Sequence, residues 1–303
     1  MPYVYFLFNC LIWGSSFILM DRAAHALGPL AIATIRLLGG SLTLALYWAW
    51  TRPQVHIRRS DWKHIVLIAA MSNAWPFTVL PFVMAQADEH GYFGMMVSLV
   101  PLVTILASIP MLGIWPTTRQ VVGVVGGLIC LGGVVLDGSH RGIAPWVLAL
   151  AVTVPITYAT GNTYIKWKLG HLDPLPMTVL FLGIAGILLL PLQLFPELLA
   201  RAGLAGPAEP RDWPMAIVSM IFLAALSTGL ATLMFLRMVK YQGPLFAGMV
   251  TYVIPLVALA WGQYDSERLT TLQITAISGV LLMVALVQWR AAGTNQPQAE
   301  PLV

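Results

Sequence analysis

The chain is dominated by long apolar segments separated by short polar connections. Ten such segments are long enough to cross a bilayer, at approximately 3–20, 30–50, 63–86, 91–112, 119–136, 145–165, 174–195, 213–236, 244–262 and 270–289. A spanning helix needs about 20 mostly apolar residues. Only 9% of the residues are charged, against about 25% in soluble domains. The sequence therefore predicts an all-α integral membrane protein of ten transmembrane helices, with the lipid bilayer and not nucleic acid as its partner.

Lysine and arginine in the connections predict the orientation, because cytoplasmic loops carry an excess of both. With the N-terminus in the cytoplasm, ten basic residues fall on the inner side and five on the outer side. We therefore expect both termini in the cytoplasm. Short connections and the lack of organelle-targeting features favour a bacterial inner (plasma) membrane. Residues 291–303 are polar and contain two prolines, which predicts a disordered cytoplasmic tail.

Motifs of the first half return in the second half. Gly94-Met95 precedes Pro101-Leu102-Val103 at the same spacing as Gly248-Met249 precedes Pro255-Leu256-Val257. Because five helices is an odd number, a second copy enters the membrane in the opposite direction. Transporters built in this way hold their substrate near the bilayer midplane, between the repeats. We expect residues 1–140 and 141–290 to form two inverted-topology repeats around a central cavity.

The opening motif of the chain resembles a known family. Ile12-Trp13-Gly14-Ser15-Ser16-Phe17, followed by Pro29 and Ala33-Thr34-Ile35-Arg36, is similar to the start of an EamA-type repeat of the drug/metabolite transporter superfamily. This resemblance implies an exporter with a central cavity, lined mainly by helices 1, 3, 4, 6, 8 and 9. Within the superfamily, the aromatic-rich segments most resemble aromatic amino acid exporters of the YddG type. The second half departs from the pattern, with Tyr158 in place of Trp13 and Phe181 in place of Arg36.

The charged residues bear on the mechanism. Every Asp and Glu lies at a helix end, in a connection or in the tail, so no carboxylate is placed to carry a proton through the midplane. This favours facilitative transport by alternating access, although a proton-coupled drug/metabolite antiporter remains the alternative. Arg36 is the only charge in the middle of a span. It either meets a substrate carboxylate or, more simply, snorkels to the outer surface or bonds to a neighbouring helix end.

Uncharged polar and aromatic residues on the helices expected to face the cavity form the predicted substrate site. They are Trp13, Ser16, Asn73, Trp75, Ser98, Tyr158, Asn162, Ser227, Thr228 and Tyr252. Such groups bind the polar and apolar parts of a small ligand, or else they only join helices to one another. Five prolines are predicted hinges, or static kinks: Pro76, Pro81, Pro101, Pro155 and Pro255.

These features predict an exporter of aromatic or neutral amino acids, or of similar small amphipathic metabolites. We expect no cofactor, no metal site and no enzymatic activity, because the spans carry no recognisable catalytic motif or acid pair. An intramembrane enzyme is therefore disfavoured. A channel is disfavoured too, since neither a charge ring nor a filter-like loop is visible. Small residues on the fifth helix, Gly123 and Gly127, favour close helix contacts within a monomer.

Overall fold

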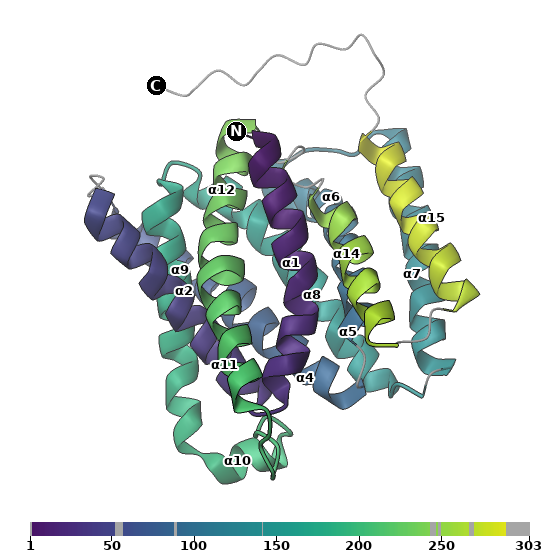
Figure 1. The fold of residues 1–303 in the computed structure, drawn as a ribbon. Helices are drawn as coiled ribbons and strands as arrows, with labels where there is room; N and C mark the ends of the chain where they lie inside the picture. Colours follow the sequence, from purple (N-terminus) through teal and green to yellow (C-terminus); the bar gives the residue numbers. More distant parts are fainter. Residues whose placement is uncertain are drawn as a thin grey trace.

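The computed structural model describes residues 2–51, 57–87, 90–140, 142–242, 247, 250–266 and 270–288. Within these ranges the regular secondary structure is all helical, and the long helices stand side by side in one bundle (Figure 1). The first turn of α1 and the last described turns of α15 lie at the same end of this bundle (Figure 1). The tail predicted at 291–303 lies outside the described residues.

The first half of the chain contains five helical stretches, two of which change their helix type along their length. They are α1 (Pro2–Ala24); α2 (Pro29–Thr51); α3 (Asp61–Ile68), the π-helix η1 (Ala69–Ala74) and α4 (Trp75–Ala87); α5 (His90–Met96), the 3-10 helix η2 (Val97–Leu99) and α6 (Val100–Leu112); and α7 (Thr118–His140). Each coincides with one of the predicted apolar segments.

The second half follows a similar order. It comprises α8 (Pro145–Tyr164) and the π-helix η3 (Ile165–Leu169); α9 (Pro174–Leu189) and the 3-10 helix η4 (Leu190–Leu194); the short α10 (Pro196–Arg201); α11 (Trp213–Ile221), the π-helix η5 (Phe222–Leu230) and α12 (Ala231–Gln242); α14 (Val250–Tyr264); and α15 (Thr271–Gln288). Prolines at the first or second position begin several of these helices, where a missing N–H costs no hydrogen bond.

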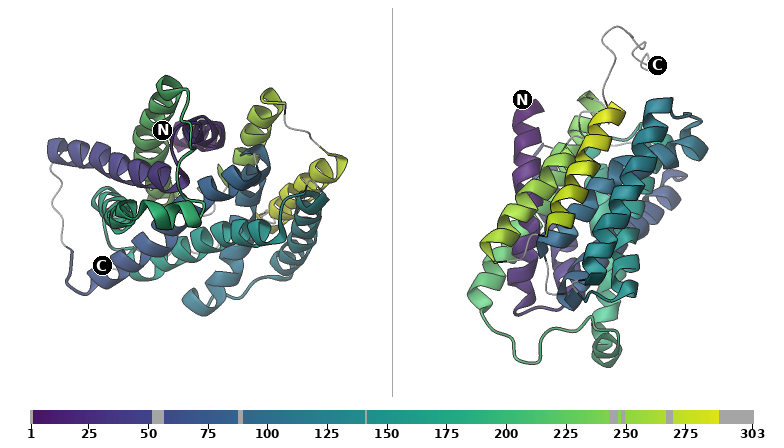
Figure 2. Two further views of the ribbon diagram at one scale, coloured as in Figure 1. Left: turned by 90° about the horizontal axis from the view of Figure 1, so that it is seen from below. Right: turned by 90° about the vertical axis from the view of Figure 1, so that its right-hand side faces the viewer.

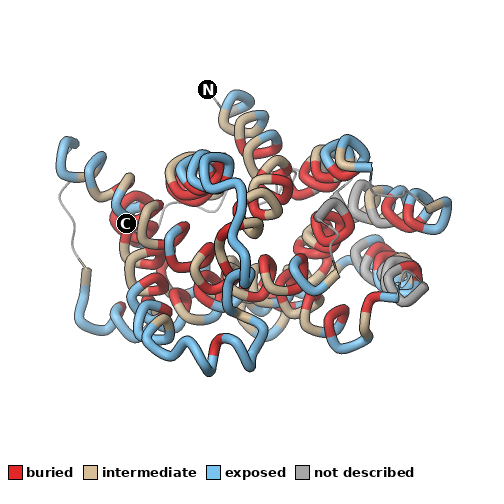
Figure 3. Tube along the Cα trace, turned by 60° about the horizontal axis from the view of Figure 1, so that its bottom comes forward, coloured by how far each residue is buried: buried red, intermediate tan, exposed pale blue. Residues whose placement is uncertain are grey.

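Among the described residues, six stretches are both long and apolar enough to cross a membrane. They are Tyr3–Ala24, Pro29–Thr51, Asp61–Ala87, Tyr92–Leu112, Pro174–Leu194 and Trp213–Tyr241. Shorter apolar helices add Val121–Cys130, Val253–Tyr264 and Thr271–Met283. The outward faces are also apolar, as at Leu46 and Leu282, each 65% exposed. Buried residues gather on the inward faces of the helices, and exposed residues cover the periphery (Figure 3).

Glycines set how closely the helices approach one another. A Cβ at Gly127 would overlap the Leu102 side chain, and one at Gly94 would overlap the Ala258 Cβ. α7 and α15 lie side by side at one edge of the bundle (Figures 1 and 2), where Gly126 faces Met283. These glycine contacts, Gly127 among them, are made within the chain, as predicted for helix 5.

Candidate functional site

Trp13 connects α1 to the π-helix η5. Its indole Nε1 donates a hydrogen bond of 2.9 Å to the Ser227 carbonyl oxygen, and its ring centroid lies 5.1 Å from that of Phe235 on α12. Ser16, one turn further along α1, is buried, and its hydroxyl donates to the Trp13 carbonyl at 2.6 Å. Two predicted residues of the first half thus lie against the predicted Ser227 of the second half.

α2 approaches η5 with almost no side chain between the two backbones. A Cβ at Gly40 would stand 2.9 Å from Thr228 Cγ2 and 3.1 Å from the Ala224 carbonyl oxygen. A Cβ at Gly229 would stand 3.2 Å from the Gly40 carbonyl oxygen. Only glycine fits such an approach without a shift. The contact brings Arg36, one turn before Gly40, beside Thr228.

Arg36 is buried among side chains from four other helices. Its Nε donates to Thr228 Oγ1 at 3.2 Å, and its Nη1 donates to the Met20 sulfur at 2.8 Å. The guanidinium carbon lies 4.7 Å from the Phe77 ring centroid, and the neutral phenol of Tyr158 on α8 lies in the same neighbourhood. With only 6% of its surface exposed, Arg36 does not reach the surface of the bundle. It bonds to neighbouring helices, at Met20 one turn before the end of α1 and at Thr228 within η5.

A second polar contact joins η1 to α8. Ser72 donates to the Thr157 carbonyl at 3.0 Å, and a Cβ at Gly161 would overlap the Ser72 hydroxyl. The Asn73 amide donates to the Ile68 carbonyl at 3.2 Å, which satisfies an acceptor where the α-helix passes into the π-helix. Trp75 is 45% exposed, and its Nε1 donates to Thr153 Oγ1 at 2.9 Å.

Four predicted or neighbouring polar residues therefore lie in π-helical turns. Ser72 and Asn73 belong to η1, and Ser227 and Thr228 belong to η5. π-Helical segments are rare and often occur at functional sites. Neither segment was predicted from the sequence. Pro76 lies two residues after the end of η1 and is the one sequence signal near it, and η5 contains no proline.

The remaining predicted site residues are less central. Ser98 is 1% exposed in η2, and its hydroxyl donates to the Met95 carbonyl at 2.7 Å. Asn162 is partly buried on α8, one turn beyond Tyr158. Tyr252 belongs to α14, and its side chain lies outside the part that the structure describes. Of the predicted residues, Trp13, Ser16, Ser227 and Thr228 thus lie together around η5, Asn73 and Trp75 lie at η1, and Ser98 bonds within its own helix.

Three buried polar atoms have no hydrogen-bond partner within the described part of the chain. They are Asn9 Oδ1, Ser219 Oγ and Ser227 Oγ. Buried polar groups are normally paired, so these atoms mark places where a further group could bind. Ser227 precedes Thr228, whose hydroxyl bonds to Arg36, so one orphaned hydroxyl lies in the same turn of η5 as the contact with the buried charge.

Comparison with known proteins identifies the family. The sequence model of the EamA-like transporter family matches residues 1–136 and again residues 145–289. The chain belongs to the EamA-like transporter family. It is therefore a multi-pass membrane transporter and not an enzyme, as the sequence predicted.

Individual relatives of this EamA-like transporter are bacterial. It is 22% identical over 278 residues to the uncharacterized transporter YoaV of Bacillus subtilis (strain 168), covering 90% of each chain. It is 24% identical over 281 residues to the uncharacterized transporter YvbV of the same strain, covering 92% of this chain and 88% of YvbV. Protein PecM of Dickeya dadantii (strain 3937) is 25% identical over 303 residues, with 96% and 93% covered. The particular likeness to YddG-type exporters stays a prediction.

A solved structure shares the fold of this EamA-like transporter. It is described only as the crystal structure of a protein, and it superposes with a TM-score of 0.63 at 14% sequence identity, covering 92% of this chain and 97% of that one.

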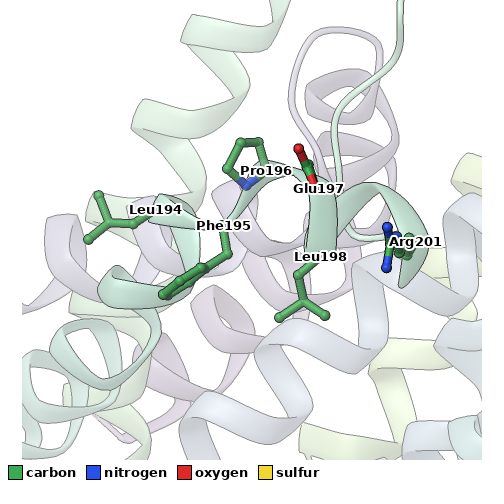
Figure 4. Close-up of a pocket in the computed structure, with 6 residues that line it drawn as sticks. All are labelled: Leu194, Phe195, Pro196, Glu197, Leu198 and Arg201. Atoms are coloured by element: carbon green, nitrogen blue, oxygen red, sulfur yellow. The ribbon is translucent and has the colours of Figure 1, made fainter.

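A groove on the surface of the EamA-like chain lies away from the predicted site. It has a volume of about 410 Å³ and is lined by Leu194, Phe195, Pro196, Glu197, Leu198 and Arg201, at the turn from η4 into α10 (Figure 4). None of the predicted substrate residues lines it. The candidate site is therefore the buried group around Arg36, which sequence reasoning located in part: it named Trp13, Tyr158, Ser227 and Thr228.

Proposed function

We propose that this transporter exports aromatic or neutral amino acids, or similar small amphipathic metabolites, by alternating access. The observation that carries the proposal is the meeting of aromatic rings and hydroxyl groups around a buried guanidinium. Trp13 and Tyr158 both pack against the largest buried cluster and could hold an apolar side chain. Ser227 and Thr228 supply hydroxyl groups for the polar part of a substrate. Export, and amino acids as cargo, rest on the resemblance to YddG-type exporters.

The proposed architecture is ten membrane spans in two inverted five-helix repeats, residues 1–140 and 141–290, around a central cavity. The two separate family matches support this division. So do the π-helices η1 and η5, which begin eight and nine residues after the starts of α3 and α11, in corresponding helices of the two halves. α1 starts and α15 ends at one end of the bundle (Figure 1), which favours an even number of crossings.

The proposed membrane and orientation follow from the same observations. Bacterial relatives favour a bacterial inner membrane, and the distribution of lysine and arginine favours cytoplasmic termini. The glycine contacts of α7 with α6 and α15 are internal, which supports a monomer.

Moving parts are proposed at the points where helices are weakened. Pro81, Pro155 and Pro255 lie inside α4, α8 and α14, where each removes a backbone hydrogen bond. Pro76 and Pro101 stand just after η1 and η2, where the helix type changes. π-Turns interrupt the regular i to i−4 ladder in the same way. The proposal is that these turns and prolines together let the helices bend, so that the central cavity opens first to one side of the membrane and then to the other.

The proposed transport is facilitative. Every carboxylate in the described part of the chain lies at a helix end or in a connection. Asp61, for example, begins α3, where its carboxylate lies 3.2 Å from His171 Nε2. No acidic group of the described core is therefore placed to carry a proton through the midplane, which favours uncoupled movement down the substrate gradient.

Flux into proteoliposomes tests the proposal. We expect uptake of labelled L-phenylalanine that saturates with concentration and is accelerated by unlabelled L-phenylalanine on the opposite side. An imposed pH gradient should not drive accumulation above the equilibrium level. Uphill accumulation would establish the proton-coupled antiporter instead, linear flux without saturation would indicate a channel, and absence of flux would overturn amino acid transport.

A further inference from the structure

Arg36 carries a positive charge near the middle of the bundle. It lies seven residues beyond Pro29 at the start of α2, which is about 10 Å along the axis at 1.5 Å per residue. Its side chain is buried, so water does not solvate the charge. A charge at such depth is costly, and in membrane proteins it usually pairs with another group or serves a functional pathway.

The resident partners of Arg36 are neutral. A guanidinium has five N–H donors, and two of them bond to the Thr228 hydroxyl and the Met20 thioether. Sulfur is a weak acceptor. The Phe77 ring adds a cation–π contact. Across the residues that the structure describes, no carboxylate forms an ion pair with Arg36. The charge therefore has no anionic partner there, and three of the five N–H donors take no part in the two bonds to Thr228 and Met20.

The surroundings suit an anion that comes and goes. The Thr228 hydroxyl and the Met20 sulfur are neutral acceptors that a carboxylate could displace, because a carboxylate adds an opposite charge and accepts two parallel N–H···O bonds from one guanidinium. The Thr228 hydroxyl is already 3.2 Å from Arg36 Nε, so it could turn and donate to the second oxygen of the same group. Residues from α2 and η5 would then hold one substrate group together.

We propose that Arg36 is the binding residue for the carboxylate of the transported molecule, so that the substrates are zwitterions or organic anions and not organic cations. This inference rests on the proposed function and assigns its substrate class. A guanidinium binds a carboxylate through two parallel hydrogen bonds, a geometry that lysine does not reproduce.

Binding to the purified protein tests the inference. The probes are L-phenylalanine and 3-phenylpropionate, which carry a carboxylate, and L-phenylalaninamide and phenethylamine, which do not. A ligand that prefers the folded state raises the melting temperature with its concentration. For the wild type we expect the two carboxylates to raise the melting temperature at concentrations at least about tenfold lower than the two probes without a carboxylate. A charge-assisted bidentate contact implies a difference of this size. Equal responses to acid and amide, or no response to either carboxylate, would overturn the site.

Variants separate binding from structure. In folded Arg36→Gln we expect the preference for carboxylates to disappear, and in Arg36→Lys we expect part of it to remain. The matched control is Arg201→Gln, on exposed α10, which should keep the full preference. An Arg36→Gln protein that still distinguishes acid from amide would contradict the proposal. The comparison of ligands on wild-type protein needs no variant, so a folding failure of Arg36→Gln leaves the test intact.

The two proposals can fail separately. Carboxylate binding without saturable flux would refute the proposed transport and leave the anion site standing. Saturable flux of L-phenylalanine, together with equal binding of its amide, would refute the anion site and leave the transport standing.

Discussion

Replacing Gly40 with alanine tests the close contact between α2 and η5. The added Cβ would lie 2.9 Å from Thr228 Cγ2 and 3.1 Å from both the Ala224 carbonyl oxygen and the Gly229 nitrogen. A normal carbon–carbon contact is about 3.5–4.0 Å, so the two helices would have to separate by about 0.6 Å or more. Two of the three obstructing atoms belong to the backbone and cannot rotate away.

The expected cost follows from this separation. Overpacking of this kind costs about 1–3 kcal/mol. A shift of that size would also lengthen the 3.2 Å bond between Arg36 Nε and Thr228 Oγ1 to roughly 3.8 Å, beyond hydrogen-bonding distance. Loss of a hydrogen bond to a charged group costs about 1.5–3 kcal/mol, while alanine recovers about 1 kcal/mol of helix propensity. We expect a net loss of about 1.5–5 kcal/mol.

Gly132→Ala is the matched control. Gly132 also lies within a helix, α7, and a Cβ there would meet no heavy atom within 4 Å. The change should be neutral or stabilise by up to about 1 kcal/mol. Equilibrium unfolding of both variants in detergent, with wild type alongside, measures the difference. If Gly40→Ala proves as stable as Gly132→Ala, the helices are not in the contact described, and the placement of Arg36 beside Thr228 is wrong.

Two further substitutions probe the polar contacts of the π-helices. Trp13→Phe removes the hydrogen bond between α1 and the Ser227 carbonyl and should cost about 1–1.5 kcal/mol of stability. Trp75→Phe should cost less than about 0.5 kcal/mol, since Trp75 is half-exposed and the Thr153 hydroxyl still donates to the Leu150 carbonyl. Comparable losses in the two unfolding experiments would contradict this ranking. Gly161→Ala should destabilise the protein because its Cβ overlaps the Ser72 hydroxyl, and adding Ser72→Ala should restore part of the loss. A double-mutant cycle measures this coupling, and strict additivity would refute the contact.

The sequence located the helices well because a bilayer fixes their length. A span must be apolar over about 20 residues, and charges and prolines mark where it ends. Trp13, Ser227 and Thr228 could be predicted in the site because polar and aromatic groups are conspicuous within apolar helices.

The surroundings of Arg36 could not be predicted. Its burial depends on the contact of Gly40 with η5, two segments far apart in the chain, and its partners Met20 and Phe77 are ordinary residues of an apolar helix. The π-turns were missed for the same reason: local sequence specifies a helix, whereas the packing of neighbouring helices decides whether an extra residue is accommodated in a turn.

Accessibility of position 227 tests alternating access most directly. Ser227→Cys would be made after Cys10 and Cys130, the two free cysteines, have been replaced by alanine. Position 227 is buried in this structure. We expect a membrane-impermeant thiol reagent to label it from either side of the membrane, and saturating L-phenylalanine to slow the labelling. Labelling from one side only, or labelling that L-phenylalanine leaves unchanged, would contradict a central substrate site that opens to each side in turn.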